Sequence, residues 1–407
     1  MESHGSFACE TQESAVPLPM RLRSVVLAAA LAIALVLPTA LPHASASTAV
    51  PGSSLARWRV VKVFGPENGV TYPGFLDVTS RDDAWSWWNS SCASCPGQGS
   101  VSFLEHWNGT RWIKKTPPAA AEGGIVGLGA SSQRNLWLFT VDTIRGHAVK
   151  RALIWNGSWH TIHLPDWTIS FSRAGFYAAQ PEVFGPRSVW LFELALRAVD
   201  VYNGHRWTRH ALPGYPGDIN VISPTDIWAI GRGKSFDRQF LMHWNGARWR
   251  TLQIPRPARI PKNSIEYVSG LVATAPHDLW LARYIETGSQ GARTLYLLHW
   301  ARGRWHKVPF RFPTSWTLLS AQDGHGGLWM ASNGPAPRYS WYFDHLSRTG
   351  HWTRQAGPTV PGTNFGQISV LAPMAWIPGT ISVWATGNLD PQHSNDAILG
   401  AIFKYGP

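Results

Sequence analysis

The sequence predicts an all-β fold, a seven-bladed β-propeller of four-stranded blades that is closed by an N-terminal strand completing the last blade. Three observations support this fold. The 407 residues are 44% hydrophobic and include 24 Trp, 38 Gly and 30 Pro, which is typical of many short strands joined by turns. Two short patterns recur about every fifty residues, a period found in propellers and solenoids. Both ends of the repeating region carry an incomplete repeat.

The first recurring pattern places an apolar residue and then Trp after a turn residue. Its first copy is Asp83-Ala84-Trp85 and its last is Ser382-Val383-Trp384. Equivalent positions of a repeat pack in equivalent places, so we expect these indoles in the interfaces between blades, each contributing on the order of 2–3 kcal/mol. The seven copies carry Trp85, Trp137, Trp190, Trp228, Trp280, Trp329 and Trp384.

The second pattern is a Trp-Asn-Gly unit that closes with another Trp, as in His106-Trp107-Asn108-Gly109-Thr110-Arg111-Trp112. Asn-Gly is the strongest signal for a two-residue hairpin turn, in which both central residues take positive φ. A His precedes the unit in several copies. One His per blade on separate strands favours a hydrogen-bonded structural role over metal binding, and the Asp that opens the first pattern is expected to cap a turn. These His residues are His106, His243, His299 and His345.

The two ends of the chain are expected to complete one blade. The seventh unit stops at Pro407, before its last strand, whereas Arg57–Val63 is a last strand with no unit of its own. We therefore predict that Arg57–Val63 pairs with Ala397–Tyr405. This pairing would cover two sheet edges that could otherwise template aggregation.

Residues 1–46 are predicted to be an N-terminal extension and signal peptide. A basic segment begins at Met20, a 13-residue apolar run spans Val25–Leu37, and Ala44-Ser45-Ala46 is a small-residue cleavage site. The start of translation, Met1 or Met20, stays open. The apolar run is shorter than the roughly 20 residues of a membrane-spanning helix, so no transmembrane segment is expected after cleavage. We expect residues 47–407 to form a single propeller domain and to be secreted.

These repeats resemble those of secreted bacterial Trp-Asn-Gly β-propellers and, more distantly, those of kelch-type propellers. The resemblance extends over about Arg57–Pro407. The paired glycines that follow the second strand in kelch repeats are reduced here to single ones at Gly231 and Gly387. The resemblance implies a recognition scaffold and does not name a ligand.

Cys92 and Cys95 lie in the loop Asn89–Ser100. A disulfide that tightens this loop is the favoured interpretation, because an exported chain meets an oxidising compartment. A structural zinc site would need a second pair of ligands that the chain lacks, and a redox-active pair normally lies at a helix start in another fold.

Catalytic, metal and cofactor motifs are missing from the sequence, and none of these groups is predicted. The favoured function is a secreted, non-catalytic propeller that binds an extracellular protein or an anionic or polysaccharide ligand. The alternative is an extracellular hydrolase or lyase acting on a polysaccharide, which a cluster of carboxylates at the mouth of the central channel would favour. The net charge of +12 is spread along the chain, so nucleic acid is an unlikely partner.

The candidate ligand-binding face is the one formed by the loops between second and third strands and between blades. These loops vary from unit to unit while the Asn-Gly turns on the opposite face are nearly constant, as expected where recognition occurs. Cations and aromatic rings in or beside them suit an anionic or sugar ligand. The candidate residues are Trp88, Trp167, Trp316, Arg145, His147, Arg232, Lys234 and Arg338.

Overall fold

The computed structural model divides the chain into two compact units, Met1–Ser53 and Ser54–Pro407. The residues that the structure describes all belong to the second unit. They are 56–65, 69–91, 100–121, 124–145, 147–169, 179–234, 238–257, 262, 264–287, 292–314, 316–334, 341–368, 374–392 and 397–407. The predicted signal peptide lies outside them.

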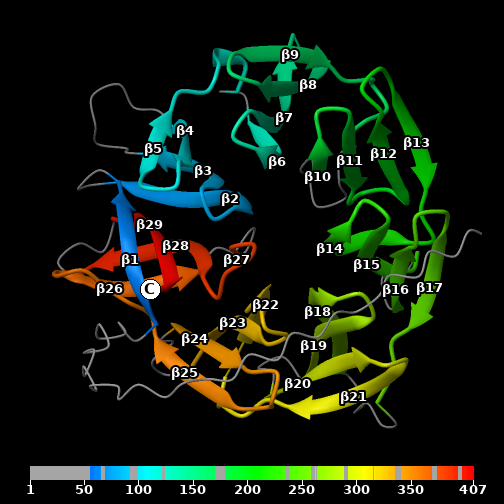
Figure 1. Cartoon of the computed structure of the whole chain (residues 1–407), viewed down its shortest axis with the longest axis vertical. Coiled ribbons are helices and arrows are strands. Elements are labelled where there is room, and N and C mark those ends of the chain that lie inside the picture. The colour runs from blue at the N-terminus through cyan, green and yellow to red at the C-terminus, as the bar shows by residue number, and fades with distance from the viewer. Residues whose placement is uncertain are drawn as a thin grey trace, which may run out of the picture. The chain divides into compact units, whose positions relative to one another are not determined.

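The second unit consists of seven antiparallel sheets, blades 1 to 7, arranged around a ring (Figure 1). In blades 1 to 6 the four strands pair in chain order. Blade 1 contains β2 (Val70–Ser80), β3 (Asp83–Ser91), β4 (Ser100–Trp107) and β5 (Trp112–Lys115). Blade 2 contains β6 (Ile125–Ser132), β7 (Asn135–Ile144), β8 (His147–Trp155) and β9 (Trp159–His163), and follows the short 3₁₀ helix η1 (Ala119–Ala121). Blade 3 contains β10 (Ala179–Gly185), β11 (Ser188–Glu193), β12 (Ala198–Tyr202) and β13 (Trp207–Ala211).

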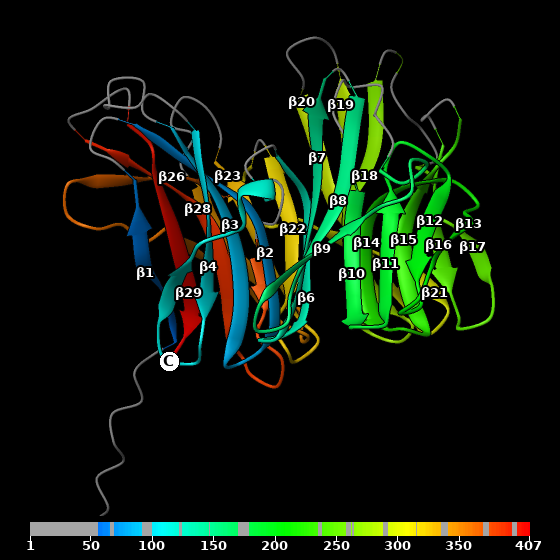
Figure 2. The ribbon, with the colours of Figure 1, turned by 90° about the horizontal axis from the view of Figure 1, so that it is seen from above.

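The next three blades repeat this plan. Blade 4 contains β14 (Tyr215–Ser223), β15 (Asp226–Arg232), β16 (Gln239–Trp244) and β17 (Trp249–Gln253). Blade 5 contains β18 (Ser264–Ala275), β19 (Asp278–Thr287), β20 (Ala292–Ala301) and β21 (Arg304–Pro309). Blade 6 contains β22 (Trp316–Gln322), β23 (Leu328–Asn333), β24 (Trp341–Leu346) and β25 (Trp352–Ala356). In Figure 2 the hairpins β7–β8 and β19–β20 extend furthest on the loop face.

Blade 7 joins the two ends of the chain, as the sequence predicts. Its strands are β26 (Thr363–Ile368) with β27 (Met374–Trp376), β28 (Val383–Pro391), β29 (Leu399–Gly406) and β1 (Arg57–Phe64). Strand β1 pairs with β29 from Arg57 opposite Gly406 to Phe64 opposite Gly400. The predicted closure is confirmed, and the first strand of this blade is present as two segments, β26 and β27, which both pair with β28.

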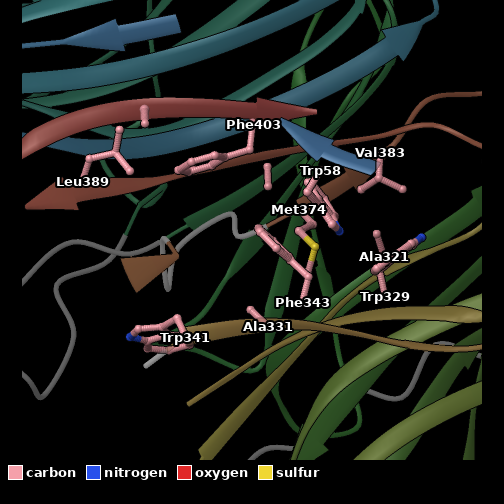
Figure 3. Close-up of a cluster of buried hydrophobic side chains, with 12 residues drawn as sticks. Trp58, Ala321, Trp329, Ala331, Trp341, Phe343, Met374, Val383, Leu389 and Phe403 are labelled. Atoms are coloured by element: carbon pink, nitrogen blue, oxygen red, sulfur yellow. The ribbon is translucent and has the colours of Figure 1, made fainter. Parts of the chain in front are cut away.

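Aromatic packing secures this closing strand (Figure 3). The Trp58 ring of β1 stacks on Phe343 of blade 6 with centroids 3.8 Å apart, and it meets Trp329 edge-on at 5.3 Å. Trp58 is 5% exposed. Strand β1 is therefore fixed both by its backbone ladder to β29 and by a side chain buried against the neighbouring blade.

A Trp-His-Asp unit recurs in blades 1, 4, 5 and 6. The indole stacks on the His that faces it across the strand pair, at centroid distances of 4.0, 3.8, 3.7 and 4.5 Å respectively. Nε2 of each His donates to an Asp carboxylate at 2.8–2.9 Å. In blade 6 the carboxylate comes from Asp323, because Gly327 occupies the usual Asp position. The predicted structural role of the recurring His is confirmed.

The Asn-Gly hairpins differ from the predicted turn. Gly109, Gly157, Gly204 and Gly246 have positive φ, whereas the Asn before each of them does not. Trp107 pairs with Trp112, so the first of these loops has four residues, and Asn108 Oδ1 accepts hydrogen bonds from the N–H groups of Thr110 and Arg111 at 3.1 and 3.0 Å. The Asn side chain thus holds the turn by capping its backbone, which removes the need for positive φ at Asn.

No helix among these residues is long and apolar enough to cross a membrane.

Candidate functional site

The described loop-face residues that the sequence predicts lie in different environments. Arg145 and His147 are exposed where the projecting β7–β8 hairpin turns, and Arg145 has a φ of 51°. Lys234 is exposed just after β15, and Arg232 is half-buried at the end of that strand. The Trp316 side chain, Arg338, Cys92 and Cys95 lie outside the described residues, so the predicted disulfide stays a prediction.

Trp88 is a buried packing residue, which corrects the expectation that it lies on the rim. Strand β3 continues to Ser91, and Trp88 is 0% exposed at the junction of blades 1 and 7. Its ring lies 4.6 Å from that of Phe64 in the closing strand. Both faces of β3 are covered by neighbouring blades, so alternation along the strand moves a side chain from one interface to the other and not to solvent.

Trp167 presents an exposed ring in the segment between blades 2 and 3. It is 39% exposed, and the guanidinium carbon of Arg209 lies 4.9 Å from its ring centroid. Arg209 Nη2 also donates to the Trp167 carbonyl at 2.6 Å, and Lys150 Nζ donates to the carbonyl of Thr168. Contacts from two blades therefore fix the segment and leave one indole face open.

A larger candidate site lies at the junction of blades 3 and 4, where a cavity of about 550 Å³ opens between β11–β13 and the β16–β17 hairpin. Three indoles meet there. The centroid of Trp190 is 5.4 Å from that of Trp244 and 6.5 Å from that of Trp249. The complete lining is Trp190, Val199, Val201, His210, Ala211, Leu212, Pro213, Trp244, Arg248 and Trp249.

Blade 3, which lines this cavity, lacks the Trp-His-Asp unit. Val201 faces Trp190 across the strand pair, where four other blades have His, and Ser188 replaces the Asp. A valine covers less of an indole face than an imidazole does. Trp190 is half-buried, whereas the other six Trp residues of the first pattern are buried, including Trp137, which faces Ile154 in blade 2.

The polar groups at this cavity are mostly hydrogen-bond donors. No described residue accepts a hydrogen bond from the indole N–H of Trp190, Trp244 or Trp249, and none of the described lining residues is acidic. Arg248 adds an exposed cation and His210 an exposed imidazole. An apolar pocket with a few converging polar groups is the usual form of a small-molecule site.

A second cavity of about 450 Å³ occurs at the junction of blades 2 and 3. It is lined by Trp137 and by Ile154, which takes the position of the missing His in blade 2. Tyr202 of blade 3 contributes a ring, and Arg134 and His160 contribute polar groups. Each cavity is lined in part by a blade with an aliphatic residue at the His position, Val201 in blade 3 and Ile154 in blade 2, so the sequence contained a signal for both.

Two carboxylates form a further feature. They lie on the first strands of their blades, which are the innermost strands of the ring (Figure 1). Asp77 of β2 and Glu182 of β10 occupy the same register, each facing the Trp of its own blade, Trp85 or Trp190. Both keep some exposed surface, yet the surrounding protein raises both pKa values. Burial raises the pKa of Asp77 to about 6. Burial, and then the negative charge of Asp77, raise the pKa of Glu182 to about 8.

Asp77 also has a structural role that a neutral residue performs elsewhere. Its Oδ2 accepts a hydrogen bond from the Ala130 backbone N–H in the next blade at 2.6 Å. At the same register of blade 4, Asn220 Oδ1 accepts from the Ala273 N–H of blade 5 at 3.2 Å. Asp77 and Asn220 thus make similar hydrogen bonds between the innermost strands of neighbouring blades. Across the described residues, no group of three or more His, Cys, Asp or Glu side chains is placed to hold a metal ion.

No family model matches the chain, and no curated protein matches it. Among solved structures, a protein of unknown function from Dyadobacter fermentans is 10% identical, with a TM-score of 0.43 over 88% of this chain and 100% of that one. The fungal lectin of Aleuria aurantia, a six-bladed β-propeller that recognises fucose, is 13% identical, with a TM-score of 0.40 over 74% and 100%. The GH74 xyloglucanase of Xanthomonas campestris is 12% identical, with a TM-score of 0.46 over 84% of this chain and 55% of that one. Similarity this low carries no argument about a ligand or an activity.

Proposed function

We propose that the protein is a secreted, non-catalytic propeller that binds a saccharide in the cavity between blades 3 and 4. The proposal rests on the three indoles of Trp190, Trp244 and Trp249, which meet around a cavity of about 550 Å³. The indole N–H of each donates no hydrogen bond to a described residue.

The chemistry of this cavity suits a sugar ring. One face of a pyranose consists largely of C–H groups, which pack against an indole, while its hydroxyl oxygens accept hydrogen bonds from indole N–H, Arg and His donors. Because the rings pack against one another, little conformational entropy is lost when a ligand binds. The absence of an acidic residue from the described lining leaves the pocket without a catalytic carboxylate.

Secretion belongs to the proposal and is supported by the signal-peptide pattern of residues 1–46. The exposed ring of Trp167 and the exposed cations Arg145 and Lys234 are proposed as further contacts to a polymeric ligand on the loop face.

Blocking the cavity tests the proposal without removing a core residue. Ala211 is exposed at the end of β13 and lines the cavity, so Ala211→Trp should fill it. Ala356 is the matched control, because it occupies the same register of blade 6, is also exposed, and is absent from this lining. The probe is a panel of neutral cell-wall oligosaccharides, and binding is measured by calorimetry.

We expect Ala211→Trp to weaken binding at least about tenfold, equivalent to 1.4 kcal/mol, and Ala356→Trp to leave it unchanged. Thermal midpoints of all three proteins should agree within a few degrees. Equal binding by the two variants would contradict the proposed site.

The second candidate function is hydrolysis or lysis of a polysaccharide at the innermost strands. The pKa of Glu182, raised to about 8 beside that of Asp77 at about 6, gives a protonated and an ionised carboxyl at neutral pH, as general acid–base chemistry requires. Release of reducing or unsaturated sugar ends that Glu182→Gln abolishes, with unchanged thermal midpoint, would favour this function. The hydrogen bond that Asp77 accepts from the Ala130 N–H gives Asp77 a structural role that needs no catalysis.

A further inference from the structure

In every blade, a residue of the third strand faces a residue of the fourth strand at one equivalent register position, and the blades can be compared there. In blades 1, 3 and 6 it holds a carboxylate opposite a cation: Glu105 and Lys114, Asp200 and Arg209, Asp344 and Arg354. In blades 2, 4 and 7 both positions are uncharged: Leu153 and Thr161, Met242 and Thr251, Phe403 and Val60. In blades 3 and 6 the two facing residues form an ion pair, whereas in blade 1 Glu105 pairs with Lys62 of the closing strand at 2.6 Å and Lys114 makes a cation–π contact with Phe103.

Blade 5 is the exception. Lys307 of β21 faces Leu298 of β20, so the cation is present and the carboxylate is replaced by a buried leucine. By contrast, Arg209 makes two hydrogen bonds with Asp200, at 2.8 and 2.9 Å, and Arg354 makes two with Asp344, at 2.7 and 2.9 Å. Lys307 makes only a cation–π contact among the described residues, with its Nζ 4.0 Å from the Tyr296 ring centroid.

Lys307 lies in a cavity of about 410 Å³ at the junction of blades 4 and 5. Arg256, from the segment after β17, and Arg283 of β19 contribute two further cations, and His306 contributes an imidazole. Arg283 is 2% exposed, and its Nη1 donates to the Pro255 carbonyl. A buried guanidinium beside a cavity is a fixed positive charge, since Arg does not lose its proton in proteins.

Glu266 places a carboxylate beside two of these cations. Glu266 Oε1 lies 3.2 Å from Arg283 Nε, and Oε2 lies 3.8 Å from Arg256 Nε. The Arg283 Nε–H is buried and not aligned for a hydrogen bond with Glu266 or any other described residue. Glu266 thus pairs with Arg283 and Arg256, and among the described residues it leaves the exposed Lys307 without a carboxylate and the buried Nε–H of Arg283 without an aligned acceptor. An anion in the cavity would supply both the charge and the acceptor.

We propose that the cavity between blades 4 and 5 binds the carboxylate or sulfate group of an acidic saccharide. Lys307 supplies a positive charge that faces a leucine, where the cations at this position in other blades face a carboxylate. Trp305 also lines the cavity, and its Nε1 donates to the Gln253 carbonyl at 3.2 Å, which fixes the indole beside the cations. A fixed ring next to three cations suits a charged sugar better than a simple inorganic anion. The site is separate from the cavity between blades 3 and 4.

The experiment measures binding of an oligogalacturonate and of a sulfated dextran oligomer by calorimetry at low salt. The methyl ester of the oligogalacturonate is the neutral counterpart, and inorganic sulfate is the simple anion. Lys307→Gln removes the unmatched cation. Arg304→Gln is its control, because Arg304 is exposed on the same strand, carries one positive charge and does not line the cavity. Leu298→Asp places a carboxylate opposite Lys307, as at the equivalent position of blades 1, 3 and 6.

We expect one of the two acidic oligomers to bind, with Kd raised at least about tenfold by Lys307→Gln or Leu298→Asp and less than about twofold by Arg304→Gln. The oligomer that binds shows whether carboxylate or sulfate is the recognised group, and Ala211→Trp should leave its Kd unchanged. The proposal is overturned if neither oligomer binds, if the ester binds as tightly as the acid, if inorganic sulfate alone binds equally well, or if both Gln variants lose the same affinity. If Leu298→Asp fails to fold, Lys307→Gln decides.

Discussion

At the scale of single residues, the recurring Trp of the second strand faces different residues in different blades. In blades 1, 4, 5 and 6 that residue is a His held by an Asp, and the indole is buried. In blade 3 it is Val201, and Trp190 stays half-buried beside a cavity. The Trp at one position of the repeat can therefore be a packing residue in one blade and a candidate ligand contact in another.

Gly400 gives a prediction at this scale. A Cβ at this position would lie 2.6 Å from Trp88 Cζ3, a distance that real Cβ atoms essentially never show. Gly400→Ala should therefore destabilise the closing junction by about 1–3 kcal/mol, measured by urea unfolding. Gly185→Ala is the control, because nothing lies within 4 Å of a Cβ there. Equal loss in the two variants would show that Trp88 does not pack as described.

Glu182 predicts a pH dependence of stability. Its pKa rises from 4.5 to about 8 on folding, so the native state holds the proton more tightly than the unfolded state does. The contribution of Glu182 is fully present below pH 4.5, and the free energy of unfolding falls as the pH rises through about 8. The side chain keeps some solvent contact, so we expect a loss of about 1–3 kcal/mol, less than the full linkage value.

Urea unfolding at pH 5 and pH 9 measures this loss, and Glu182→Gln should reduce it. Asp77 contributes a smaller loss of the same sign, because its pKa is also raised, from 3.8 to about 6. If the wild type and Glu182→Gln lose the same stability between the two pH values, Glu182 does not hold a proton in the native state at neutral pH.

At the scale of elements, strand β1 carries the closure of the ring. A chain that begins at Gly69 would leave the β29 edge unpaired and remove Trp58 from its contacts with Phe343 and Trp329. We expect its thermal midpoint to fall by at least about 5 °C, consistent with losing one large buried aromatic side chain and a strand. We also expect association through the exposed edge. A chain beginning at Leu55 is the control, and scanning calorimetry with light scattering gives both readouts.

The number of blades, their strands and the closing pair could be predicted from the sequence, because the repeat imposes one pattern seven times. The turn geometry could not, since the Asn side chain caps a longer loop and Asn-Gly alone does not reveal loop length. The position of Trp88 was missed for a related reason. Strand β3 continues beyond the repeating pattern, and only the neighbouring blade shows that its second face is covered.

The candidate sites were predictable only where the repeat departs from itself. Val201 and Leu298 break patterns that other blades keep, and both breaks lie at cavities. Their significance depends on which strands face each other, which a single sequence does not state. The pair of Asp77 and Glu182 left no local signal at all, because the two residues come from different blades.

At the scale of the whole molecule, the ring places repeated junctions side by side and lets each junction differ. The cavities at the 3–4 and 4–5 junctions both flank blade 4, and one is rich in indoles while the other is rich in cations. The scaffold can therefore carry different side chains at its junctions without changing its fold, since the strand ladders and most of the Trp core are the same in every blade.

The most direct measurement of the central claim is a crystal structure of the protein with an oligosaccharide selected from the binding panel. The account predicts a sugar ring lying among Trp190, Trp244 and Trp249, with its hydroxyls accepting hydrogen bonds from their indole N–H groups. A sugar bound instead on the loop face or beside Glu182, with the cavity between blades 3 and 4 empty, would contradict it.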